Sequence, residues 1–164
     1  MRSRRASHGI AQPLNCGVSR HGTRMAFSQS YEGTCHCRSV GFVYRTALGP
    51  EEWPIRACQC TFCRTHAALS TSDPRGSLEF FEQVPAALNR YRFGLKTADF
   101  LTCRNCGAYI GAMMRSGSKG FGIINIRVLQ SVLDRVQEAQ PMDAHRNRLA
   151  TRCGGWSWIS CQGT

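Results

Sequence analysis

The sequence lacks the features of a membrane protein. Within its 164 residues, no uncharged apolar run approaches the roughly 20 residues that a transmembrane helix needs. The basic N-terminus is not followed by the apolar segment of a secretory signal, and the chain contains neither a P-loop nor a dinucleotide-binding fingerprint. We therefore expect a cytoplasmic protein with no membrane partner, and no motif indicates a nucleotide cofactor.

Acidic residues are scarce, because 10 Asp and Glu stand against 21 Lys and Arg, for a formal net charge of +11. Five of the positive charges lie in residues 1–24, which contain no acidic residue and no hydrophobic period. We expect this segment to be a disordered basic tail, either upstream of a true start at Met25 or an arm that touches nucleic acid or a membrane. The positive charge suits an anionic partner, but it does not distinguish nucleic acid from a small acidic metabolite.

Long helical patterns are missing before residue 128, whereas short strand patterns are frequent. Residues 40–45 alternate with the period of two that is typical of a strand. Further short strands are predicted at 77–81, 90–93, 99–103, 108–114 and 121–128. One short helix is predicted at 131–140, with Ser131 as its N-cap.

These patterns predict the fold class and the domain organisation. With 42% apolar and 19% charged residues, the chain is typical of a globular protein that buries one core. Short strands at regular spacing indicate a compact all-β domain with few short helices. We place this domain at residues 25–135, followed by a C-terminal extension, 136–164, that packs on the domain or is partly disordered.

Cysteine, by contrast, is abundant, with ten residues in a chain that has no export signal. In a reducing compartment disulfides are rare, so clustered cysteines more often bind metal or take part in catalysis. Seven of the ten lie in three tight clusters, and Cys16, Cys153 and Cys161 stand apart. The clusters are Cys35 and Cys37; Cys58, Cys60 and Cys63; and Cys103 and Cys106.

The first and third clusters together have the composition of a structural zinc site. In a strand, residues i and i+2 point to the same face, so Cys35 and Cys37 would present two thiols together. Cys103 and Cys106 form a C-x-x-C motif followed by glycine, a tight turn that directs backbone N–H groups at the sulfurs. A thioredoxin-like redox motif is the rival interpretation, but it expects a helix at the motif, whereas 108–112 is predicted to be a strand. Because structural zinc takes four ligands, we predict that the two pairs complete one site.

The second cluster places Cys58, Cys60 and Cys63 within six residues. Three protein ligands leave one of zinc's four positions vacant, which is the pattern of a catalytic site that accepts water or substrate. Because zinc is borderline-soft and deprotonates a coordinated thiol, a thiol-bearing substrate suits such a site. The alternative is a second structural site closed by a fourth protein ligand. The candidates for that ligand are His66, Cys16, Cys153 and Cys161.

Three motifs follow one another along the chain: G-T-C-H-C at 33–37, C-Q-C-T-F-C-R at 58–64 and C-R-N-C-G at 103–107. In this order and grouping, the chain resembles the family of the glutathione-dependent formaldehyde-activating enzyme and centromere protein V. The resemblance covers roughly residues 30–130 and implies an all-β fold, the β-tent, with two zinc ions per chain. It implies a structural ion on Cys35, Cys37, Cys103 and Cys106 and a catalytic ion on Cys58, Cys60 and Cys63.

The resemblance also implies an activity. The family's reaction joins glutathione and formaldehyde to give S-hydroxymethylglutathione, which is a carbon–sulfur lyase reaction run in reverse and serves aldehyde detoxification. In this chain, Cys58, Cys60 and Cys63 would be the catalytic residues. Arg64 is the candidate to hold the carboxylates of the thiol substrate.

Three function classes are compatible with the sequence. The first is an enzyme that acts on a small thiol and a small aldehyde, with Phe62, Tyr91 and Phe93 as candidates for the pocket wall. The alternative is a non-enzymatic zinc module that binds nucleic acid or chromatin, which the net charge supports. The third is a redox or metal-buffering protein that releases zinc when its thiolates are oxidised.

Overall fold

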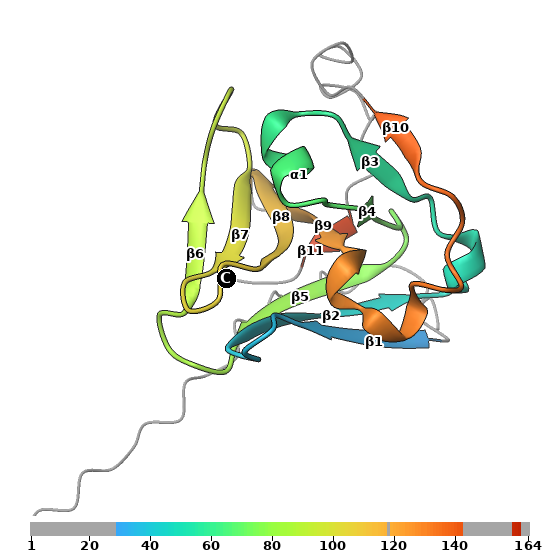
Figure 1. Ribbon diagram of the computed structural model, residues 1–164, viewed down its shortest axis with the longest axis horizontal. Coiled ribbons are helices and arrows are strands. Elements are labelled where there is room, and N and C mark those ends of the chain that lie inside the picture. The colour runs from blue at the N-terminus through green and yellow to red at the C-terminus, as the bar shows by residue number, and fades with distance from the viewer. Residues whose placement is uncertain (1–28, 118, 143–158, 162–164) are drawn as a thin grey trace, which may run out of the picture.

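Short strands account for most of the regular structure in the computed structural model, which describes residues 29–117, 119–142 and 159–161 (Figure 1). The strands are β1 (Gln29–Thr34), β2 (Val40–Thr46), β3 (Arg56–Cys58), β4 (Ser70–Thr71), β5 (Ser77–Glu82), β6 (Leu88–Tyr91), β7 (Asp99–Cys103), β8 (Tyr109–Ser116), β9 (Lys119–Asn125), β10 (Gln140–Met142) and β11 (Ile159–Cys161). The helices are α1 (Thr61–Thr65) and the 3-10 turns η1 (Pro50–Glu52), η2 (Ile126–Val128) and η3 (Gln130–Val132). The predicted all-β fold with few short helices is confirmed. The predicted tail, 1–24, lies outside the described residues.

Strand β2 shows how the sequence period builds the core. Val40, Phe42, Tyr44 and Thr46 are all fully buried, which is the alternation that a strand with one face against the core requires. Antiparallel neighbours β1 and β5 flank β2 and hold it in register. The main core therefore forms on one face of these three strands, against residues from β7, β8 and β9.

The described strands join in a single branched sheet, in the order β1-β2-β5-β11-β9-β4-β3-β10, with β8, β7 and β6 added from β9. The pairings are antiparallel except for β10 with β3 and β11 with β5. Figure 1 shows β1, β2 and β5 along one side of the molecule, β6, β7 and β8 standing steeply against them, and α1 with β3 at the opposite end. Strands β10 and β11 belong to the predicted C-terminal extension. Across the described part of the chain, none of the helices has the length and apolar character that a membrane crossing requires.

The predicted helix at 131–140 is wrong. The chain there makes successive three-residue turns, with Val132 N–H bonded to Leu129 C=O at 3.1 Å and Arg135 N–H bonded to Val132 C=O at 3.0 Å. Leu129 and Val132 are buried in the main core, so their spacing of three residues matches a 3-10 turn rather than an α-helix. Likewise the strand predicted at 121–128 ends at Asn125, whose side chain caps η2.

Candidate metal centres

The turn between β1 and β2 carries the first cysteine pair. Cys35 and Cys37 do not lie in a strand, so that part of the prediction is wrong: the Cys35 N–H donates to the Val40 carbonyl and the Arg38 N–H to the Cys35 carbonyl, each at 2.9 Å. Arg38 takes a positive φ of 60° to close the turn. The turn nevertheless brings the two Sγ atoms to 3.6 Å, which is the proximity that the prediction needed.

The second pair lies at the turn that follows β7. Cys103 ends that strand, and the Gly107 N–H donates to its carbonyl at 2.9 Å. Gly107 has a φ of +75°, a conformation in which a residue without a Cβ meets no steric penalty. Burial raises the pKa of Cys103 to about 12, while the backbone N–H groups of Cys106 and Asn105 act in the opposite direction by hydrogen bonding to its sulfur. The predicted turn, with its N–H groups directed at the sulfur, is present.

These two turns come together although they are distant in sequence. The Sγ atoms of Cys37 and Cys103 lie 3.6 Å apart, and all four sulfurs lie within 4.8 Å of one another. A tetrahedral ion with metal–sulfur bonds of about 2.3 Å, as for zinc, places its sulfurs about 3.8 Å apart. The four sulfurs therefore fit a metal ion with little rearrangement. The set is Cys35, Cys37, Cys103 and Cys106.

Ser39 links the two turns, and sequence reasoning missed it. Its Oγ accepts a hydrogen bond from Asn105 Nδ2 at 3.0 Å and lies 3.2 Å from the Cys37 sulfur. Hydrogen bonds from Ser39 lower the pKa of the exposed Cys37 thiol to about 6. A hydroxyl that holds a ligand sulfur in its thiolate form is typical of the layer of residues around a metal site.

The second set of sulfurs is built from one local segment. Cys58 is the last residue of β3, Cys60 is the N-cap of α1, and Cys63 lies one turn into that helix. The Cys63 N–H donates to the Cys60 sulfur at 3.4 Å, and the three Sγ atoms lie within 4.8 Å of one another. A strand end and a helix N-terminus thus bring together the three thiols that the C-x-C-x-x-C spacing predicts.

The electrostatics of this set favour a bound cation. Hydrogen bonding to Cys58, together with burial, raises the pKa of Cys63, and burial raises the pKa of Cys60. Because three thiolates packed together repel one another, they stay protonated unless a positive ion compensates them. The donor set therefore fits a metal ion.

A fourth ligand to this set is absent among the described residues: no further Cys, His, Asp or Glu ligand atom lies within 4.8 Å of all three sulfurs. The His66 ring instead packs on Phe62, with ring centroids 4.5 Å apart. Cys16 and Cys153 lie outside the described residues, and the side chain of Cys161 is not described. Among the described residues, three ligand atoms therefore make up this set, and an open fourth position stays a prediction.

Aromatic side chains pack beside the three-cysteine set. Phe62, next to Cys63 in α1, stacks on Tyr91 and Phe93 with centroids 5.8 and 5.3 Å away. It also makes edge contacts with Phe100 at 4.9 Å and Tyr109 at 5.2 Å. The three predicted wall residues are thus brought together. Phe100 and Tyr109 were missed, because period-two alternation does not tell which face of a strand turns towards a site.

A cavity of about 530 Å³ is lined by Cys35 of the four-cysteine set and by Tyr109, which packs beside the three-cysteine set. No acidic residue lines it, so its electrostatic character is basic. Besides Cys35, the polar and charged lining residues are Thr34, His36, Arg38, His66, Tyr109, Asn125 and Arg127. Arg64, predicted to hold substrate, is exposed on α1 and lines neither this cavity nor the one described next.

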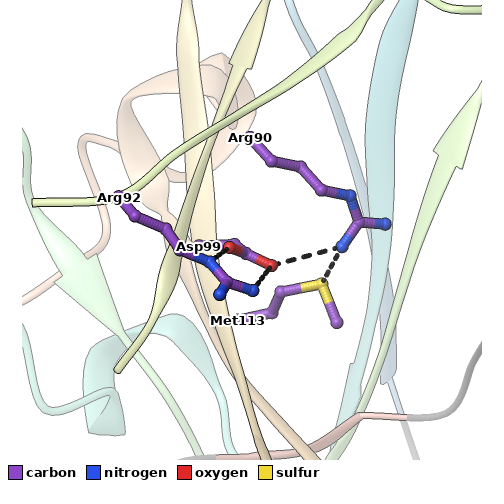
Figure 2. A network of polar contacts seen from close by, with 4 residues as sticks. All are labelled: Arg90, Arg92, Asp99 and Met113. Atoms are coloured by element: carbon purple, nitrogen blue, oxygen red, sulfur yellow. Dashed lines mark hydrogen bonds and ion pairs between the residues drawn. The ribbon is translucent and has the colours of Figure 1, made fainter. Parts of the chain in front are cut away.

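A second cavity, of about 650 Å³, lies on the sheet formed by β6, β7 and β8. Figure 2 shows Asp99 between two arginines at this cavity: it pairs with Arg92, and its Oδ2 lies 3.5 Å from Arg90 Nη1. The same Arg90 nitrogen lies 3.2 Å from the Met113 sulfur. Hydrogen bonding from Arg92 lowers the pKa of Asp99. The acidic group therefore neutralises part of the positive charge in this cavity.

Comparison with known proteins leaves the function open. No family model matches this chain, and no curated protein matches it. Among solved structures, it is similar to the crystal structure of a Rhodobacter sphaeroides protein, a Northeast Structural Genomics target, with 28% sequence identity over 68% of this chain and 99% of that one, and a TM-score of 0.49. That description names no activity or ligand. Membership of the family that the motifs resemble stays a prediction.

Proposed function

We propose that this protein is a zinc-dependent enzyme that joins a small thiol to a small aldehyde, with glutathione and formaldehyde giving S-hydroxymethylglutathione as the reference reaction. In reverse this is a carbon–sulfur lyase. The observation that carries the proposal is the set of Cys58, Cys60 and Cys63, which has no fourth ligand among the described residues. Catalytic zinc sites keep such a position open, whereas structural sites close it.

The residues of this chain have distinct roles in the proposal. Cys58, Cys60 and Cys63 would hold the ion. A zinc ion bound there supplies a borderline-soft position that favours a thiol in its thiolate form. Phe62 and the rings around it keep water away from the reacting atoms, and the basic cavity beside Tyr109 suits the carboxylates of a glutathione-like thiol.

The reaction needs no redox partner. The thiol sulfur bonds to the aldehyde carbon, and the proton that the thiol loses ends on the aldehyde oxygen. The chain therefore has to bring two small molecules together in reacting distance, which is a matter of positioning. The four-cysteine set, which offers all four ligands of a closed site, is assigned to holding the fold.

The test follows exchange between glutathione, formaldehyde and their adduct by NMR with zinc-loaded protein. We expect faster exchange than in buffer, loss of this acceleration in Cys63→Ser, and its retention in Thr65→Ala, an exposed α1 residue. Arg38→Ala tests the arginine that lines the cavity, and Arg64→Ala tests the arginine predicted from the sequence. Removing the arginine that binds the substrate should raise KM, and removing the other should leave KM unchanged. Exchange no faster than in buffer would overturn the assignment.

The alternative function, nucleic-acid binding, has one structural observation in its favour. Arg90, Arg92, Lys96 and Arg115 line the second cavity. Asp99 pairs with two of these side chains and reduces their joint charge. A salt titration with duplex DNA, on the full chain and on a chain that starts at Met25, tests this function. Binding that weakens steeply with salt and survives removal of the tail would favour it over the enzyme.

A further inference from the structure

The hydroxyl of Tyr109 is buried without a hydrogen-bond partner among the residues that the structure describes. The residue begins β8, is 3% exposed, and packs in one buried cluster with Cys58, Cys63 and Ala68. Buried polar groups almost always have a partner, so each exception needs a physical explanation. Three side-chain atoms of the described chain share this property, the Tyr44 hydroxyl, Ser70 Oγ and the Tyr109 hydroxyl, and that of Tyr109 belongs to the cluster that contains Cys58 and Cys63.

The surroundings of this side chain explain why no protein group satisfies it. Three rings lie near the Tyr109 ring: Phe62 at a centroid distance of 5.2 Å, His66 at 5.8 Å and Phe100 at 6.1 Å. The Tyr109 carbonyl, in contrast, has a firm partner, because it accepts a hydrogen bond from the buried Asn125 Nδ2 at 2.9 Å. The Tyr109 backbone is therefore held in place, whereas its hydroxyl has no acceptor among the described protein groups.

The packing places this side chain beside the ligand sulfurs. Tyr109 shares its buried cluster with Cys58 and Cys63, and Cys60 and Phe62 are partly buried against the same cluster. A phenol hydroxyl can donate one hydrogen bond, and an anionic sulfur ligand of this set would be an acceptor for it.

We propose that the Tyr109 hydroxyl donates a hydrogen bond to the sulfur of a thiolate substrate that occupies the fourth position of the three-cysteine set. This makes Tyr109 a positioning residue and a selector of anionic sulfur ligands, and it rests on the proposed function of that set. The bond orients one lone pair of the sulfur and leaves another for the aldehyde carbon. No proton transfer from Tyr109 is required.

The test uses full-length protein loaded with cobalt(II), glutathione as the probe, and Tyr109→Phe. We expect glutathione to change the cobalt absorption of the unaltered protein, and to bind Tyr109→Phe about tenfold or more weakly, as a lost hydrogen bond to a charged group predicts. The sulfur-to-cobalt band should also shift to lower energy in the variant. Tyr44→Phe is the matched control, because Tyr44 is fully buried in the main core, away from the cysteines of this set, and it should bind glutathione like the unaltered protein.

A stability measurement gives a second, independent readout. Without metal and thiol, Tyr109→Phe should be at least as stable as the unaltered chain, because it removes an unpaired buried hydroxyl. With both bound, it should gain less stability than the unaltered chain. In protein labelled with ¹³C at the tyrosine ring carbon that bears the hydroxyl, the Tyr109 signal should move on thiol addition while the Tyr44 signal stays.

The outcomes separate this inference from the proposed function. Equal glutathione affinity in Tyr109→Phe and the unaltered protein overturns the inference, even where the NMR exchange is accelerated. Tyr109-dependent glutathione binding without any acceleration of exchange supports the inference and removes the enzymatic assignment. Absence of glutathione binding to the unaltered cobalt protein overturns the inference.

Discussion

Replacing Cys103 by Ser should destabilise the whole domain, because the four-cysteine set connects segments that are distant in sequence. Cys37 and Cys103 are 66 residues apart, with sulfurs 3.6 Å from each other. In the chain-entropy model, a cross-link that closes a loop of this length restricts the unfolded chain by about 4 kcal/mol. For a domain of this size, such a loss lowers the melting temperature by about 10–20 °C.

The position of Cys103 adds to this effect. It is 2% exposed and belongs to the main core together with Cys35, so a hydroxyl placed there loses apolar contacts as well as a ligand. The assay combines elemental analysis with thermal unfolding. We expect the unaltered protein to hold two zinc ions per chain and Cys103→Ser to hold one, with the lower melting temperature given above.

The matched comparison is Cys63→Ser. Its partners Cys58 and Cys60 lie within six residues of it, so a metal ion there closes only a short loop. Such an ion therefore stabilises the folded state less than an ion in the four-cysteine set. This variant should also hold one zinc ion, but with a smaller fall in melting temperature than Cys103→Ser. Equal falls in the two variants, or two zinc ions retained in Cys103→Ser, would refute the reasoning.

Three further predictions concern single residues. Gly107→Ala meets no atom within 4 Å of its new Cβ, so only its φ of +75° is unfavourable, and urea unfolding should show a loss of about 1 kcal/mol. Asn125→Ala removes a buried side chain that accepts from two backbone N–H groups and donates to the Tyr109 carbonyl, and it should cost about 2–4 kcal/mol in the same assay, whereas a loss below about 0.5 kcal/mol would contradict that role. Since Arg92 lowers the pKa of Asp99, the ion pair stabilises the fold above the unfolded carboxyl pKa of about 3.9, and this stability is lost as the pH falls through the lower folded pKa. Asp99→Asn should therefore be slightly less stable than the unaltered protein at pH 7, by under about 1 kcal/mol, and the two stability curves should converge under acid conditions; parallel curves would contradict the pairing.

Strand positions were predictable wherever one face of the strand is buried. The alternation at 40–45 identified β2, and the strand expected at 99–103 is β7 with the same bounds. Both strands place apolar side chains against the main core, so the period of two is imposed by burial and is visible in the sequence. The strand expected at 90–93 lies two residues earlier, as β6, because its exposed side chains carry no such period.

Short elements were not predictable in the same way. β3, β4 and α1 have three, two and five residues, too few to show a hydrophobic period. They form because their neighbours bind them: β4 pairs with β9 and β3, and α1 is capped by the sulfur of Cys60. The helix expected at 131–140 fails for a related reason, since core contacts made every third residue select 3-10 turns there.

By itself the sequence determined the all-β class and the division of seven cysteines into a set of four and a set of three. The spacing of thiols along a chain restricts local geometry strongly, because one or two intervening residues leave few ways to bring sulfurs together. Only the tertiary structure decided what surrounds those sulfurs. Tyr109 packs beside the three-cysteine set, Asn125 holds the Tyr109 carbonyl from β9, and Asn105 reaches Ser39 across 66 residues of chain. Such long-range packing has no signature in local sequence.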